Sequence, residues 1–363
     1  MSIGGKIIYS DIVPKISTKS GPYAYINTSA SSSVTVVDIT TKVEVERIPV
    51  GSNMGALVLT PNEEFLYTAT AVSGTYHVSV VKTGSWKVVA KVDVSLAFGL
   101  YPSSMAATPD GKTVYVALHD PKNKTIFQTR SAVCAISTRT NKVTAVIDLS
   151  YAGPPVNGWP SPVPGCALVG GCGSVGQLAI RPNCPQLYAP VGYANKIAVI
   201  DTASNRVIKT FQAGSGPWLA FAPNGRRYYV VNTYNLGIRA FNASDDSMSP
   251  NPISPGGVCG APESLAVTPN SKRLYVACVD SDSLSVIDFD PKRNTYSFVG
   301  NIPLPDKPFP VAITPNGGEV WAVTGGDTAP QAIVIDTRTN TVVKTIPLPG
   351  AGPDRIVIGK KIY

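Results

Sequence analysis

Short stretches of alternating apolar and polar residues recur along the chain and predict many short β-strands. Two clear examples are residues 284–288, Leu-Ser-Val-Ile-Asp, and residues 197–201, Ile-Ala-Val-Ile-Asp. Turn residues such as Thr-Arg-Thr-Asn follow several of these stretches. Because alternation with a period of two between turn residues is typical of strands, we expect an all-β fold.

A proline followed by Asn or Asp, with an aromatic residue six positions after the proline, marks a repeating unit. The six copies are Pro61 with Tyr67, Pro109 with Tyr115, Pro182 with Tyr188, Pro223 with Tyr229, Pro269 with Tyr275, and Pro315 with Trp321. Successive aromatic residues lie 41 to 73 positions apart, although the offset inside each copy is constant. A fixed short offset within a variable period indicates one structural unit with loops of free length.

Each unit is predicted to contain four strands. The first is a short apolar run such as residues 264–268, which a Pro-Asp-Gly or Pro-Asn-Gly turn follows. The second carries the aromatic residue, as in residues 114–117, and the third alternates. A turn such as Thr-Arg-Thr-Asn then leads to an outer strand, for example residues 341–346.

A seventh unit lies near the start of the sequence, where Tyr25 and Asp38 are thirteen residues apart, as are Tyr188 and Asp201. Residues 354–358 look like a first strand without a unit of its own. We expect this segment to complete the seventh unit, since a ring of sheets otherwise keeps an open edge. The similarity of residues 5–9 to residues 359–363 leaves a different closure open.

These features predict one seven-bladed β-propeller domain over residues 1–363, with four antiparallel strands per blade and a ring closed by the N- and C-terminal segments. The expected blades are 20–50 with 353–363, 54–95, 102–150, 175–213, 216–255, 262–304 and 308–348.

The repeat resembles that of the YVTN family of seven-bladed propellers. The resemblance is carried by Thr-Pro-Asp-Gly-Lys-Thr-Val-Tyr-Val-Ala at 108–117 and Thr-Pro-Asn-Ser-Lys-Arg-Leu-Tyr-Val-Ala at 268–277. The segments Ser-Val-Ile-Asp at 285–288 and Val-Ile-Asp-Thr at 334–337 add to it. It covers nearly the whole chain and implies the fold. It implies little about activity, because relatives include surface-layer repeats, subunits of quinone-cofactor amine dehydrogenases and lactonase-like enzymes.

Composition argues against several kinds of partner. The formal charge is +8, but the Lys and Arg residues are scattered without a run of five, so no nucleic-acid partner is expected. No run of eighteen apolar residues predicts a membrane span, and residues 1–6 lack the apolar run of a signal peptide, although a removed leader stays open. With two His residues and no Cys-x-x-Cys pattern, neither a metal nor another cofactor is expected.

Three long insertions, at 119–131, 150–176 and 245–261, are predicted to lie on one face of the ring. Long loops on one rim of a rigid scaffold favour a site there, so we expect a site at the mouth of the central channel. An aromatic rim with acids, a base and an arginine would orient a small-molecule ligand. The alternative interpretation is structural, because the mouths of such channels are polar and wet in any propeller.

Four residues are the catalytic candidates at this mouth. His119 is predicted as a general base with Glu263 or Asp280 as its partner across the channel, and Arg355 or Arg130 as the group that stabilises an oxyanion. The candidate ligand-binding residues are Tyr101, Arg130, Trp159, Gln177, Tyr193, Trp218, Asn232, Tyr234, Phe309 and Asp327.

Six cysteines allow disulfides. Cys259 and Cys278 should both lie on the long-loop face and are the first candidate pair, while Cys166 and Cys172 lie close enough for a local bridge. The other two cysteines, Cys134 and Cys184, fit small buried apolar positions. Disulfides would favour a secreted or periplasmic protein, with the cytoplasm still open.

Three functions remain open from these residues. The first is a small-molecule-binding propeller, as a cofactor-free lyase, isomerase or lactone hydrolase that uses a His and carboxylate pair. The second is a non-catalytic propeller that binds a protein or glycan partner. The third is a subunit docked to a redox partner. A deep pocket with His119, Glu263 and Arg355 would favour the first, and a flat apolar face the second.

Overall fold

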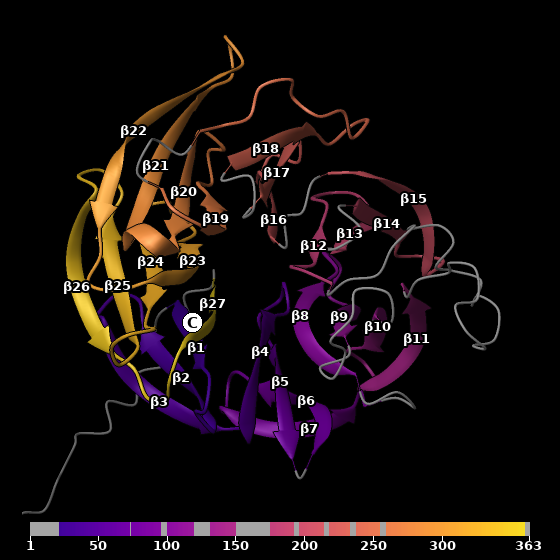
Figure 1. The fold of residues 1–363 in the computed structure, drawn as a ribbon. Coiled ribbons are helices and arrows are strands. Elements are labelled where there is room, and N and C mark those ends of the chain that lie inside the picture. Colours follow the sequence, from indigo (N-terminus) through magenta and orange to yellow (C-terminus); the bar gives the residue numbers. More distant parts are fainter. Residues whose placement is uncertain are drawn as a thin grey trace, which may run out of the picture.

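A computed structural model describes residues 22–72, 74–95, 100–119, 131–149, 175–191, 196–213, 218–232, 237–254 and 259–359. Seven antiparallel sheets are arranged radially around one axis, as predicted (Figure 1). No helix in this part of the chain is long and apolar enough to cross a membrane.

Each blade runs from an inner strand near the axis to an outer strand at the rim. Blade 1 is β27 (Pro353–Ile358), β1 (Tyr23–Thr28), β2 (Ser33–Asp38) and β3 (Val43–Pro49); blade 2 is β4 (Ser52–Leu59), β5 (Phe65–Val72), β6 (Thr75–Lys82) and β7 (Lys87–Asp93); blade 3 is β8 (Tyr101–Ala107), β9 (Thr113–His119), β10 (Ser131–Ser137) and β11 (Lys142–Asp148); blade 4 is β12 (Ala179–Ile180), β13 (Gln186–Val191), β14 (Lys196–Asp201) and β15 (Arg206–Gln212). Blade 5 is β16 (Trp218–Phe221), β17 (Arg227–Asn232) and β18 (Gly237–Asn242); blade 6 is β19 (Pro262–Val267), β20 (Arg273–Cys278), β21 (Ser283–Asp290) and β22 (Thr295–Pro303), with the 3-10 helix η3 (Val279–Ser281); blade 7 is β23 (Pro308–Ile313), β24 (Glu319–Thr324), β25 (Gln331–Asp336) and β26 (Thr341–Pro347).

The ring closes in blade 1 through a strand from the far end of the chain. β27 pairs antiparallel with β1, and Val357 lies opposite Tyr25. The prediction that residues 354–358 complete the first blade is confirmed. The alternative that used residues 5–9 and 359–363 depends mostly on residues outside the described part of the chain.

Blade 5 departs from the four-strand pattern at its outer edge. Residues 248–253 follow β18 and are joined to it by isolated bridges, Phe241 to Met248 and Ile238 to Ile253. Pro250 and Pro252 lie in this segment and lack the N–H group that a continuous ladder requires. The outer edge of this blade is therefore irregular.

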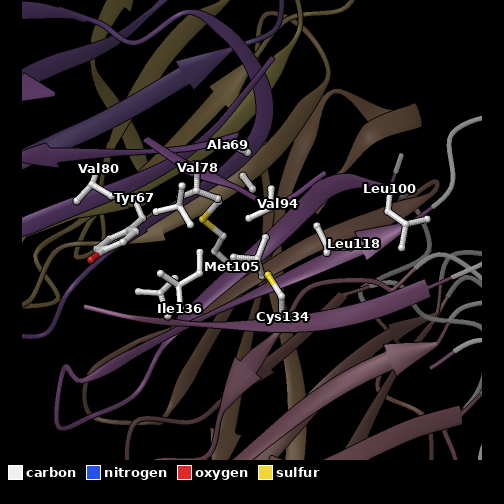
Figure 2. Packing of buried hydrophobic residues seen from close by; sticks show 14 of the residues in the cluster. Tyr67, Ala69, Val78, Val80, Val94, Leu100, Met105, Leu118, Cys134 and Ile136 are labelled. Carbon is white, nitrogen blue, oxygen red and sulfur yellow. The ribbon is translucent and has the colours of Figure 1, made fainter. Parts of the chain in front are cut away.

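The hydrophobic core consists of layers between adjacent blades. The layer between blades 2 and 3 contains Tyr67, Val80, Met105 and Ile136, all of them buried (Figure 2). Side chains on alternate positions of each strand face opposite neighbouring blades, so every blade is packed on both faces. This explains why the third strands are almost continuously buried, although they contain polar residues such as Thr35 and Ser285.

The repeat tyrosine connects one blade to the next. In blades 2, 3 and 6 its hydroxyl donates a hydrogen bond to an Asn side chain in the outer turn of the following blade; the pairs are Tyr67 to Asn141 at 2.9 Å, Tyr115 to Asn205 at 2.6 Å, and Tyr275 to Asn340 at 2.9 Å. Each of these Asn residues has a positive φ, which Asn tolerates better than most residues. The two features that define the sequence repeat therefore join neighbouring units.

Replacing Tyr275 with Phe should lower stability by about 1 kcal/mol, because the change removes one hydrogen bond and leaves the Asn340 acceptor behind. The melting temperature measures this effect. Tyr296→Phe is the matched control, since the Tyr296 hydroxyl is 3.5 Å from that of Tyr229 and its bond is the weaker one. An equal loss in both variants would contradict a specific role for the tyrosine–asparagine bond.

Candidate functional site

Five inner strands carry a β-bulge or register shift at the same place, near the end that faces away from the Pro-Asn turns. One to three residues of the inner strand have no partner in the adjacent ladder there. The residues at this position are Gly55, Ser103, Glu263, Phe309 and Asp354, and we call the four that carry a side chain the bulge ring. Each of these residues lies five positions before the first residue after its strand, for example Ser103 before Thr108. A bulge breaks the alternation of side chains along a strand, so the side chains of these four residues depart from the regular pattern at the same end of the ring.

Arg355 follows the bulge in β27 and reaches across the axis. Its Cζ atom lies 4.2 Å from the ring centroid of Trp218 in blade 5, and its Nη2 donates to the Ser103 carbonyl in blade 3 at 3.4 Å. One side chain therefore contacts blades on the other side of the ring from its own. Burial lowers the pKa of this guanidinium to about 10, and the neighbouring Asp354 carboxylate opposes that effect. Arg355 remains charged at neutral pH.

Asp354 brings a carboxyl group beside this arginine. Burial raises its pKa to about 6, and the charge of Arg355 works in the other direction. The Oδ2 atom is buried and has no hydrogen-bond partner in the described part of the chain. Gly55 of blade 2 faces Oδ1, which would lie 3.8 Å from a Cβ at that position. A partly buried carboxyl with an unsatisfied oxygen is suited to proton transfer.

Glu263 and Asp280 form an acidic pair in blade 6. Burial raises the pKa of Glu263, and the Asp280 charge raises it further. Glu263 is half-buried, whereas Asp280 is exposed in η3. Gly260 allows the close approach of the two chain segments, because a Cβ there would lie 2.8 Å from the Asp280 Cβ.

A disulfide holds the same two segments together. Cys259 and Cys278 are bonded, with their Cα atoms 5.0 Å apart, which confirms the first candidate pair. Cys134 and Cys184 are free, the former buried and the latter half-buried. Cys166 and Cys172 lie outside the described residues.

His119 lies in blade 3 and packs against Tyr101. The two residues are opposite each other in β9 and β8, with ring centroids 3.8 Å apart. Burial raises the pKa of the Tyr101 hydroxyl. Glu263 and Asp280 belong to blade 6, so the pairing of His119 with either acid across the axis stays a prediction.

The other described candidates have varied surroundings. Gln177 accepts a hydrogen bond from Ser104 at 3.3 Å and so links blades 3 and 4, while Phe309 is half-buried in the bulge ring. Asp327 is exposed and forms an ion pair with Lys307 at 2.9 Å. Arg130, Trp159, Tyr193, Tyr234 and the side chain of Asn232 lie outside the described part of the structure.

Sequence reasoning did not single out Asp354 or Ser103. A signal for both was present in the inner strands, because Asp354 lies five residues before Gly359, as Glu263 lies five before Thr268 and Ser103 five before Thr108. Alignment of the inner strands on their ends would have placed these residues in one ring. Among the described residues, no group of three His, Cys, Asp or Glu side chains is arranged to hold a metal ion.

Neither a protein-family model nor a curated protein matches this sequence. Solved structures do match. A protein of Bacteroides uniformis with the provisional name 6-phosphogluconolactonase is 17% identical, with 93% of this chain and 99% of that chain covered and a TM-score of 0.70. A periplasmic gluconolactonase of Pseudomonas aeruginosa is 16% identical over 93% and 99%, with a TM-score of 0.71. Hydrazine synthase of Kuenenia stuttgartiensis is 19% identical over 91% and 94%, with a TM-score of 0.64. At these identities the likeness shows the fold alone, a seven-bladed β-propeller.

Proposed function

We propose that the axial site binds a small lactone and hydrolyses it. The observation that carries this proposal is the Arg355 guanidinium, held across the axis on Trp218 and adjacent in sequence to the partly buried carboxyl of Asp354. A cation that polarises a carbonyl and a carboxylate that accepts a proton are the two groups that ester hydrolysis needs. Two of the proteins with similar structures have lactonase names, which agrees with this assignment.

The proposed reaction begins with the lactone carbonyl oxygen hydrogen-bonded to Arg355. Asp354 takes a proton from a water molecule as the water oxygen bonds to the carbonyl carbon, and negative charge develops on the oxygen beside Arg355. The ring carbon–oxygen bond then breaks, and Asp354 returns its proton to the departing ring oxygen. The product is an open-chain hydroxy acid, whose carboxylate Arg355 also favours.

The other candidates complete this proposal. Glu263 is a second carboxyl on the bulge ring and is available to hydrogen-bond substrate hydroxyl groups, with Asp280 raising its pKa. His119 remains a proposed acid–base group on the blade 3 side, packed on Tyr101. Trp218, Gln177 and Phe309 would form the walls of the site. The Cys259–Cys278 disulfide supports a secreted or periplasmic location.

Asp354→Asn tests the proposal directly. In wild type, kcat/KM for a δ-lactone should rise with pH through about 6 and then level off, because Asp354 acts in its ionised form. In the variant this rise should disappear, and kcat/KM at pH 7 should fall by roughly 100-fold or more. Initial rates, corrected for spontaneous hydrolysis, measure both effects.

A stability measurement separates a catalytic from a structural role of Asp354. Since its folded pKa is raised to about 6, ionisation of Asp354 opposes folding above that pH and much less near pH 4. Asp354→Asn should therefore raise the melting temperature at pH 7.5 and have little effect at pH 4. At pH 7.5 the free energy of unfolding of the variant should exceed that of wild type by about 1–3 kcal/mol, after allowance for the partial exposure of Asp354.

Glu46→Gln is the matched control, because Glu46 is exposed on the outer strand β3. It should leave both the rate and the pH profile unchanged. If wild type turns over no lactone, the hydrolase proposal is wrong. Saturable lactone binding without turnover would leave a binding protein, and binding to glycan or protein surfaces alone would favour the interaction module.

A further inference from the structure

The outer hairpin of blade 6 is longer than its counterparts. In the ordinary hairpin, the turn residue with positive φ comes four positions after the third-strand residue that lies opposite the first residue of the second strand, as for Asp201 and Asn205. In blade 6 the corresponding residues, Asp288 and Asn294, are six positions apart. Two additional residue pairs, Phe289 with Tyr296 and Asp290 with Thr295, extend the β21–β22 ladder.

This extension changes the contact between blades 5 and 6. The repeat tyrosine of blade 5, Tyr229, has its hydroxyl 3.5 Å from that of Tyr296 instead of bonding to the turn Asn. Asn294 instead accepts a hydrogen bond from Arg227 at 2.5 Å. A hollow of about 250 Å³ lies between the two blades at this point, beside the Pro-Asn turns. It is on the face of the ring opposite to the bulge ring.

Hydrogen-bond donors predominate in the wall of the hollow. Arg226 and Arg227 both line it, together with Asn224 and Ser271, and no carboxylate does. Arg227 is held by its bond to Asn294 and by Phe289, whose ring centroid is 4.9 Å from the Arg227 Cζ atom. Arg226 is exposed. One guanidinium with bonding partners and one exposed guanidinium therefore line the same space.

The carboxylates nearest in sequence have other partners. Asp288 is bound by both Nε and Nη2 of Arg273, at 2.5 and 3.0 Å, and Asp290 accepts a bond from Arg293 at 3.1 Å. The Ser271 hydroxyl accepts a bond from the Asn224 N–H at 3.2 Å, so its own proton is available to donate. The positive charge of the hollow is thus not balanced from its own walls.

We propose that this hollow binds the oxyanion group of a small molecule, either a phosphate monoester or a carboxylate. Arginine forks match the geometry of both groups. The apolar wall at Phe289 would contact a short organic portion of the ligand. The volume is below the roughly 300–1,000 Å³ of sites for drug-sized ligands, so the ligand is small. This site is separate from the proposed hydrolase site and does not depend on it.

Isothermal titration with inorganic phosphate, at constant ionic strength, tests the proposal. Wild type should bind one phosphate saturably, and Arg226→Gln should raise the dissociation constant about tenfold or more. Because Arg226 is exposed, the variant is expected to fold normally. Arg206→Gln, an exposed arginine on β15, is the matched control and should bind like wild type.

A parallel titration with acetate distinguishes the two ligand chemistries. Tighter binding of phosphate assigns a phosphate group, and tighter binding of acetate assigns a carboxylate. Asp354→Asn should retain anion binding, which separates this result from the fate of the hydrolase proposal. The proposal is overturned if wild type binds neither anion saturably, or if Arg226→Gln and Arg206→Gln behave alike.

Discussion

Arg355→Lys should lower kcat/KM for lactone hydrolysis by roughly 100-fold or more, as expected for the loss of a group that stabilises an oxyanion. Lysine keeps the charge, but it is shorter and lacks the planar fork. It would therefore not reproduce both the stacking on Trp218 and the bond to the Ser103 carbonyl. The charge would remain near β27 and would no longer lie across the axis.

The same substitution should lower the stability of the folded protein only slightly, by roughly 1–2 kcal/mol. The charge is kept, so the burial that lowers the pKa of Arg355 to about 10 disfavours a charged lysine as well, and the contacts with Trp218 and the Ser103 carbonyl are lost. Measurement of kcat/KM together with the melting temperature separates the two effects. Arg206→Lys should change neither quantity. Full activity in Arg355→Lys would exclude the proposed role, and a large loss of stability would indicate a structural one.

Removal of the disulfide should have the largest effect on stability. The double variant Cys259→Ala with Cys278→Ala opens a bridge between residues 19 positions apart, for which a loss of about 3 kcal/mol is expected. The bridge also connects the segment before Glu263 to the start of η3, which carries Asp280. The melting temperature of the oxidised wild type and of the double variant, measured under the same conditions, provides the comparison.

A reducing agent supplies the control for this prediction. It should lower the melting temperature of wild type towards that of the double variant and leave the double variant unchanged. Cys184→Ala, which alters a free cysteine, should behave like wild type. If reduction leaves the wild type unaffected, the bridge does not contribute to stability as expected.

The overall architecture could be predicted because the signals that define it are local and repeated. The six-residue offset from Pro to the aromatic residue located six blades, and the thirteen-residue spacing from Tyr25 to Asp38 located the seventh. Ring closure followed from one unpaired strand at residues 354–358. The irregular outer edge of blade 5 was not foreseen, although Pro250 and Pro252 were visible in the sequence.

The candidate site was less accessible to prediction, because its geometry depends on bulges and on reach across the ring. Alternation along a strand indicates which blade a side chain faces, and a bulge breaks that rule for one residue. Asp354 was missed for this reason. Arg355 was predicted, but its contacts with Trp218 and Ser103 join three blades that are remote in sequence, which no local pattern encodes.

Ring closure in blade 1 also sets the order of events when the protein is made. A ribosome produces β27 more than 300 residues after β1, so β1 lacks this partner strand while blades 2 to 7 are made. Asp354 and Arg355 are part of that late strand. A nascent chain that stops before residue 353 would therefore have neither a closed ring nor its proposed proton acceptor and cation, and activity would arise only with the completed circle.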